Sequence, residues 1–98
     1  MKLSFELGRV GMTQRIATTT EQNESFATQL HEALTRYKNC DWGEVCDEDK
    51  KLNDNDVIRN DGARILARYG TCEGDIYILT YLIPAPDRYT TIMFTEEY

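Results

Sequence analysis

Three short runs of strand-forming residues near the C-terminus constrain most strongly how this chain can fold. Residues 63–69, 76–81 and 89–95 are rich in β-branched, aromatic and other apolar side chains. Residues 70–75 contain two glycines typical of a hairpin connection, and the prolines within residues 84–87 interrupt the next run, because proline cannot donate to a strand ladder. Because neighbouring strands usually pair, the pattern predicts an antiparallel three-stranded meander.

The N-terminus carries a shorter version of the same signal. Lys2–Leu7 alternates the apolar Leu3, Phe5 and Leu7 with polar residues, which predicts a strand with one buried face. The two glycines that flank Val10 indicate a bulge or turn directly afterwards. We therefore expect this strand to join the meander as a fourth member.

Residues 23–38 carry the clearest helical pattern, and Asn23 or Ser25 can cap the first turn. Apolar residues recur there at spacings of four, four and three, which gives one apolar stripe: Phe26, Leu30, Leu34 and Tyr37. The segment that follows brings Trp42, which we expect to fold back onto the core.

A second, short helix is predicted to begin at Glu48, with Asp47 as its cap and Leu52 as its inward residue. Residues 13–20 are ambiguous between a helical turn and irregular chain, because β-branched threonines lose rotamer freedom in a helix. The predicted fold is thus α+β: an antiparallel sheet of three to four strands, the N-terminal strand plus the C-terminal three-stranded meander, with two helices on one face. The 98 residues suit a single domain, 1–98.

Composition indicates a cytoplasmic protein. No apolar stretch approaches the roughly 20 residues of a membrane span, and the N-terminus lacks the apolar run of a secretory signal. Cys40, Cys46 and Cys72 form an odd set without a CxxC pair, which favours reduced thiols over a disulfide framework.

Negative charge is concentrated in one stretch of the chain. Residues 41–61 hold eight acidic and three basic side chains, a net −5 of the total −6. This argues against direct binding to nucleic acid and favours a protein partner with a basic surface. Spaced carboxylates can imitate a phosphate backbone, although a charge run is more often a solvated face. The candidate partner-binding residues are Asp41, Trp42, Glu44, Asp47, Glu48, Asp49, Asp54 and Asp56.

Tyrosines of the predicted strands offer a second interpretation, an aromatic platform on which a small ligand or nucleotide stacks. Core packing explains the same residues equally well. The candidate ligand-binding residues are Tyr69, Tyr77, Tyr81 and Tyr89.

No catalytic residues, metal site or cofactor are predicted. His31 is the single histidine, and it has no ligand-type partner at zinc-site spacing. Few serines and scattered cysteines suggest no nucleophile–base relay. A calcium loop beginning at Asp54 fails, because Arg59 stands where glycine is required and Ile65 where the bidentate glutamate belongs.

A resemblance to one group of proteins lies in several short motifs, in order along most of the chain: Lys2–Gly8, Asp41–Glu44, Asp49–Lys50, Leu52–Asp54, Asp61–Tyr69, and Thr90–Ile92 through Glu96–Tyr98. The chain resembles the small uncharacterised "plasmid-related" proteins of conjugative and integrative bacterial elements. The resemblance implies a mobile-element origin and supplies no activity and no site residues.

Two functions are therefore expected from the sequence. The first is a non-enzymatic accessory protein of a mobile element that binds another protein, for instance to inhibit a host defence or DNA-handling factor. The second is a binder of a small ligand or nucleotide, for which an oligomer interface, such as that of a homodimer, is the favoured place for a pocket because one small domain has little room.

Overall fold

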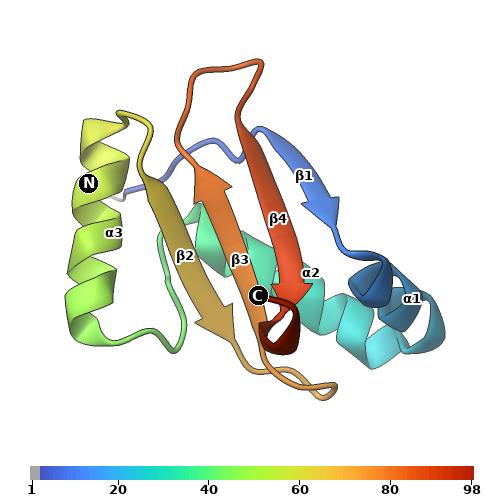
Figure 1. Cartoon of the computed structure of the whole chain (residues 1–98). Coiled ribbons are helices and arrows are strands. Elements are labelled where there is room, and N and C mark those ends of the chain that lie inside the picture. Colours follow the sequence, from blue (N-terminus) through green and yellow to red (C-terminus); the bar gives the residue numbers. More distant parts are fainter. Residues whose placement is uncertain (1–2) are drawn as a thin grey trace.

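The computed structural model describes residues 3–98 and shows three α-helices beside a four-stranded sheet (Figure 1). The elements are β1 (Arg9–Met12), α1 (Gln14–Gln22), α2 (Glu24–Lys38), α3 (Asp47–Arg59), β2 (Arg64–Tyr69), β3 (Ile76–Tyr81), β4 (Tyr89–Phe94) and a closing 3-10 turn, η1 (Thr95–Glu97). The α+β class is confirmed, and the helices number three rather than the two expected.

The C-terminal meander forms as predicted. β2 pairs with β3 and β3 with β4, both antiparallel, and the whole sheet has the order β1-β4-β3-β2. Alternate residues of β2, β3 and β4 point into the core, among them Ile65, Ile78 and Ile92, each at most 1% exposed. Period-two alternation therefore identified these strands and, in β2, the buried face.

The N-terminal strand is displaced from its predicted position. Leu3–Leu7 is not part of the sheet, and Lys2 lies outside the described residues. β1 instead occupies Arg9–Met12, where a bulge was expected, and it pairs with β4 in parallel, from Arg9 opposite Tyr89 to Met12 opposite Ile92. The sheet is consequently mixed rather than antiparallel.

The alternation in the N-terminal segment reflects burial without strand pairing. Leu3, Phe5 and Leu7 are partly buried against the core, and the Phe5 ring lies 5.3 Å from Tyr37 and 5.9 Å from Trp42 between ring centroids. A period-two pattern indicates that one side of an extended segment is buried, but it does not indicate whether a paired strand or other side chains bury it. Here the cover is the aromatic cluster beneath the sheet.

α1 and α2 cover one face of the sheet. α2 begins after Asn23, whose side chain accepts a hydrogen bond from Phe26 N, as the predicted cap requires. α1, the helix left ambiguous by the sequence, is capped by Thr13 and buries Ile16. Figure 1 shows α2 behind the sheet, α1 below β1 at the side of β4, and the opposite face in front, where only the C-terminal segment of the described chain crosses it.

α3 flanks the sheet at the edge strand β2 and is longer than predicted (Figure 1). It starts at Asp47 with Cys46 as its N-cap, one residue earlier than expected. Leu52, predicted to face inward, is 54% exposed, whereas Asn53 and Val57 are buried. The prediction of Leu52 was wrong because polar contacts of α3 to the rest of the chain, rather than an apolar stripe, set its rotation.

Candidate functional site

The predicted partner-binding residues divide into structural and free groups. Trp42 is 2% exposed and packs in the core, so it is not available to a partner, and this candidate is corrected. Asp54 and Asp56 are partly buried, whereas the other acidic candidates are exposed: Asp41, Glu44, Asp47, Glu48 and Asp49.

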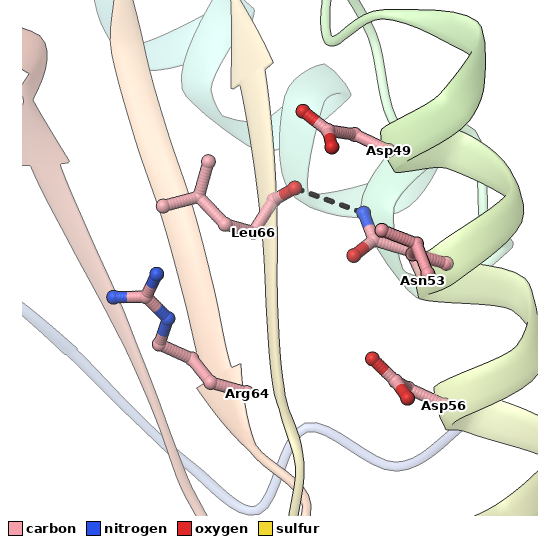
Figure 2. Close-up of a pocket in the computed structure, with 6 residues that line it drawn as sticks. Asp49, Asn53, Asp56, Arg64 and Leu66 are labelled. Carbon is pink, nitrogen blue, oxygen red and sulfur yellow. Dashed lines mark hydrogen bonds between the residues drawn. The ribbon is translucent and has the colours of Figure 1, made fainter.

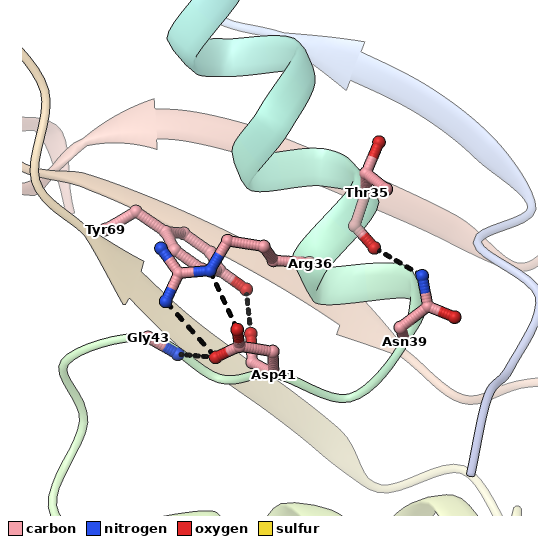
Figure 3. Close-up of polar contacts among 6 residues, drawn as sticks. All are labelled: Thr35, Arg36, Asn39, Asp41, Gly43 and Tyr69. Atoms are coloured by element: carbon pink, nitrogen blue, oxygen red, sulfur yellow. Dashed lines mark hydrogen bonds and ion pairs between the residues drawn. The ribbon is translucent and has the colours of Figure 1, made fainter. Parts of the chain in front are cut away.

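Asp41 is exposed, and its carboxylate is already engaged by neighbouring groups (Figure 3). It accepts hydrogen bonds from Arg36 Nε at 2.8 Å and Nη2 at 3.2 Å, and from Gly43 N at 3.3 Å. The Arg36 guanidinium holds the pKa of this carboxyl below its ordinary value, and it also lies 5.1 Å from the centre of the Tyr69 ring. Asp41 therefore organises the segment between α2 and α3.

Asp54 and Asp56 also have partners within the chain. Asp54 Oδ1 accepts a hydrogen bond from Trp42 Nε1 at 2.8 Å, which satisfies the one polar atom of the buried indole. Asp56 Oδ1 accepts from Arg59 Nη2 at 2.5 Å. With Asp41, three of the acidic candidates thus bind groups of the chain itself.

The remaining carboxylates lie at the start of α3. Asp47, Glu48 and Asp49 form the first turn of the helix, and Glu44 lies just before it. Negative charge is favourable there because the helix dipole is positive at its N-terminus. Among residues 3–98 none of these four carboxylates forms an ion pair, so their charge is presented to solvent.

The predicted tyrosines lie on opposite faces of the sheet. Tyr69 is 1% exposed and in the core, where its hydroxyl donates to Asp41 O at 2.6 Å (Figure 3), so it cannot serve as a stacking platform. Tyr77, Tyr81 and Tyr89 occupy strand positions that point to the helix-free face. Tyr81 and Tyr89 are 37% and 40% exposed, with ring centroids 5.7 Å apart.

A fourth tyrosine joins this face and was missed by sequence reasoning. The turn η1 brings Tyr98 over the sheet, where its ring lies 5.4 Å from Tyr77 and 5.4 Å from the Arg64 guanidinium. The Tyr98 hydroxyl also accepts a hydrogen bond from Arg64. No periodicity marks a residue that folds back after the last strand. We call Tyr77, Tyr81, Tyr89 and Tyr98 the tyrosine face.

A groove separates α3 from β2 and opens at the border of the helix-free face. It has a volume of about 270 Å³ and is lined by Asp49, Leu52, Asn53, Asp56, Arg64 and Leu66 (Figure 2). The Asn53 amide nitrogen donates to Leu66 O at 2.9 Å. A smaller hollow of about 190 Å³ lies on the other side of the molecule, lined by Leu7, His31, Leu34, Thr35 and Lys38.

The cysteines and the histidine do not meet. Cys40 is partly buried, and burial raises the pKa of its thiol to about 11, whereas Cys46 and Cys72 are exposed. His31 is exposed on α2. Within residues 3–98 no three His, Cys, Asp or Glu side chains are grouped so that they could hold a metal ion. None of the helices in that range combines the length and apolar character needed to cross a bilayer.

Comparison with known proteins identifies no relative: no family model matches the chain, and no curated protein or solved structure is significantly similar to it. The function must therefore be argued from the residues of this chain.

Proposed function

We propose that this protein is a non-enzymatic accessory protein that binds another protein through the tyrosine face and the adjoining acidic end of α3. The observation that carries the proposal is the exposure of tyrosines on a sheet face that lacks a helix layer in the described chain. Tyr81, Tyr89 and Tyr98 are 37%, 40% and 62% exposed. Tyrosine is enriched at protein interfaces because it combines a large apolar ring with a hydroxyl that can stay hydrogen-bonded.

The charge around this face favours a basic partner. Glu44, Asp47, Glu48 and Asp49 are exposed beside β2, and the chain carries a net charge of −6. Of the two arginines of β2, Arg68 is paired with Asp75 at 2.6 Å, and Arg64 contacts Tyr98 and offsets one of these four charges. Complementary charge around an apolar centre speeds association and disfavours partners of the wrong sign.

A partner that handles DNA fits this chemistry. Such proteins carry basic surfaces for the phosphate backbone, and an acidic protein that covers such a surface would inhibit it. Together with the resemblance to mobile-element proteins, this supports an accessory role against a host defence or DNA-handling factor.

A small-ligand function is less well supported. Tyr69 lies in the core, which removes one of the four expected stacking rings. The two hollows described above contain no tyrosine, so they do not provide the aromatic pocket that this function needs.

The proposal is tested by capturing partners from a lysate of the source cells with matched charge variants. Asp47→Lys with Glu48→Lys reverses charge at the α3 end, and Glu21→Lys with Glu32→Lys makes the same change on the helix layer, where both residues are exposed. A basic protein retained by the wild type and the helix-layer control, lost by the α3 variant and weakened by salt, is expected. Equal retention by both variants, or recovery of only further copies of this chain, would overturn the proposal.

A further inference from the structure

The groove between α3 and β2 has a lining suited to a single cationic side chain. Asp49, Leu52, Asn53 and Asp56 are spaced by three, four and seven residues from Asp49, which places them on one face of α3. Figure 2 shows both carboxylates and the Asn53 side chain directed from the helix toward the strand. One wall of the groove is therefore formed by oxygen atoms, with Leu52 and Leu66 adding apolar surface.

Asn53 provides an acceptor at the centre of this wall. The residue is only 6% exposed, and its amide nitrogen is committed to Leu66 O at 2.9 Å. That bond fixes the amide orientation and leaves the Asn53 Oδ1 atom facing the groove (Figure 2). A fixed, partly desolvated acceptor between two carboxylates favours a donor of positive charge.

The cations already near the groove leave room for another. Arg64 lines it, but Figure 2 shows its guanidinium turned away from α3, and this group is held by the Tyr98 ring and hydroxyl. Arg59 occupies only Asp56 Oδ1. Asp49 has no ion-pair partner among residues 3–98.

The size of the groove and the arrangement of its acceptors favour a guanidinium over other cationic groups. At about 270 Å³ the groove is below the roughly 300–1,000 Å³ typical of pockets for whole small ligands, and it suits one side chain. Asp49 and Asp56 are separated by about 10 Å along the helix axis, with Asn53 between them. The planar guanidinium has five donors and can serve one of these carboxylates together with the Asn53 oxygen, whereas ammonium is a compact point charge. Leu52 and Leu66 can contact the aliphatic stem.

We propose that the α3–β2 groove receives an arginine side chain of the protein partner. This inference rests on the proposed function and adds to it the residue type that anchors the partner. Arginine is enriched among the few residues that dominate binding energy at protein interfaces.

The test uses N-acetyl-L-arginine amide as a probe, with the corresponding citrulline and lysine amides, in an NMR titration of the full chain. Citrulline keeps the shape of arginine without its charge. The arginine probe is expected to bind in the millimolar range and to shift the Asn53 side-chain amide together with backbone amides of Asp49, Asp56 and Leu66. The citrulline probe should cause no such shifts, and the lysine probe should bind several-fold more weakly.

Two variants with equal loss of charge provide the control. Asp49→Asn with Asp56→Asn should weaken arginine binding at least fivefold, whereas Glu21→Gln with Glu32→Gln, both exposed on the helix layer, should change it less than twofold. The single variant Asp49→Asn repeats the test where Asp56 and its bond to Arg59 are left intact. Shifts outside the groove, equal binding of citrulline, or binding that survives these changes would overturn the groove proposal, and equal binding of lysine would overturn its preference for guanidinium.

Failure of this inference is distinct from failure of the proposed function. A partner that is captured normally by Asp49→Asn with Asp56→Asn, when the probe no longer binds, would remove the arginine anchor and leave the protein-binding function standing. If the arginine probe binds in the groove but no captured basic partner depends on the α3 end, the proposed function fails and the groove remains an arginine-binding site.

Discussion

At the scale of single residues, burial separates acids that hold the fold from acids that are free to bind. Asp54 and Asp47 look alike in the sequence, yet Asp54 accepts the indole hydrogen of the buried Trp42 at 2.8 Å, whereas Asp47 is exposed in the first turn of α3. A charge change at Asp54 therefore alters stability as well as charge, and it is a poor test of partner binding.

The role of Asp54 can be measured directly. Asp54→Ala leaves Trp42 Nε1 buried without its acceptor, which should lower the free energy of unfolding by about 1–3 kcal/mol. Asp54→Asn keeps a side-chain oxygen at the same place and should cost less than half as much. Urea denaturation followed by the fluorescence of this single tryptophan compares the two. Equal losses would show that charge, rather than the hydrogen bond, is what matters there.

Asp41 leads to a prediction about pH. Its hydrogen-bonded partner Arg36 lowers the pKa of the Asp41 carboxyl in the folded protein below the ordinary 3.8. The ionised Asp41 therefore stabilises the fold fully at pH values above 3.8. This contribution is lost as pH falls through the lowered pKa. Because both side chains are about half exposed, Asp41→Asn should cost no more than about 1 kcal/mol.

The measurement is a pair of urea titrations of wild type and Asp41→Asn, one near neutral pH and one well below the ordinary carboxyl pKa. The difference in unfolding free energy seen near neutral pH should shrink in acid. A difference that stays constant would mean that the Asp41 carboxylate contributes no charge-dependent stability.

The side of the sheet to which a side chain points could be predicted only where the alternation of apolar and polar residues was clear. The alternation of residues 63–69 correctly groups Tyr69 with Ile65 and Ala67, and all three are buried. The pattern of β3 does not show that Tyr81 faces away from the helices, because both sides of β3 carry apolar residues. Trp42 was correctly expected in the core, which conflicts with using it as a binding residue.

At the scale of elements, the short segment before α3 determines how that helix reaches the sheet edge. Glu44 N donates to Arg68 O at 2.8 Å, and Arg68 N donates to Trp42 O at 3.3 Å, so residues 42–44 lie along β2. Gly43 sits between them with φ +70°, and an added Cβ would be 2.0 Å from Arg68 O. Only glycine fits this approach.

Gly43→Ala should therefore lower the free energy of unfolding by more than about 2 kcal/mol, through backbone strain and the clash with β2. Gly11→Ala is the matched control, because an added Cβ there meets nothing within 4 Å, and it should change stability by less than about 0.5 kcal/mol. Thermal or urea unfolding compares them. A mild effect at Gly43 would mean that residues 42–44 can leave β2 without loss.

Helix α1 shows why one element escaped prediction. Its threonines lower helix propensity, but Thr19 Oγ1 donates to Arg15 O at 2.7 Å and Thr20 Oγ1 to Ala17 O at 2.7 Å, so their hydroxyls are satisfied within the helix. The buried Ile16 and contacts with α2 and β4 then hold it in place. Tertiary packing outweighs weak local propensity.

At the scale of the whole molecule, residues 3–98 build two layers and leave one side of the sheet without a helix (Figure 1). The meander was predictable because its strands are neighbours in sequence. The parallel pairing of β1 with β4 was not, because it joins segments about 80 residues apart that no local pattern connects. For the same reason the sequence revealed neither the fold-back of Tyr98 nor the α3–β2 groove.

The surface proposed for binding emerges only when these distant segments are brought together. The tyrosine face combines β3, β4 and the residue after η1, and the groove at its border combines α3 with β2. The acidic margin of this surface could be predicted from the charged stretch in the sequence. Which of its carboxylates lack partners within the described chain could not be predicted.

The most direct test of this binding surface is the affinity of the purified partner for Tyr81→Ser with Tyr89→Ser, measured by calorimetry against Val10→Ser with Met12→Ser. The control residues are 43% and 44% exposed on β1 and stand in register with the inward-facing Thr90 and Ile92 of β4. Loss of the tyrosines should raise Kd about tenfold or more, and the β1 control should change it less than twofold. If both variants bind as tightly as the wild type, the helix-free face of the sheet is not the binding surface.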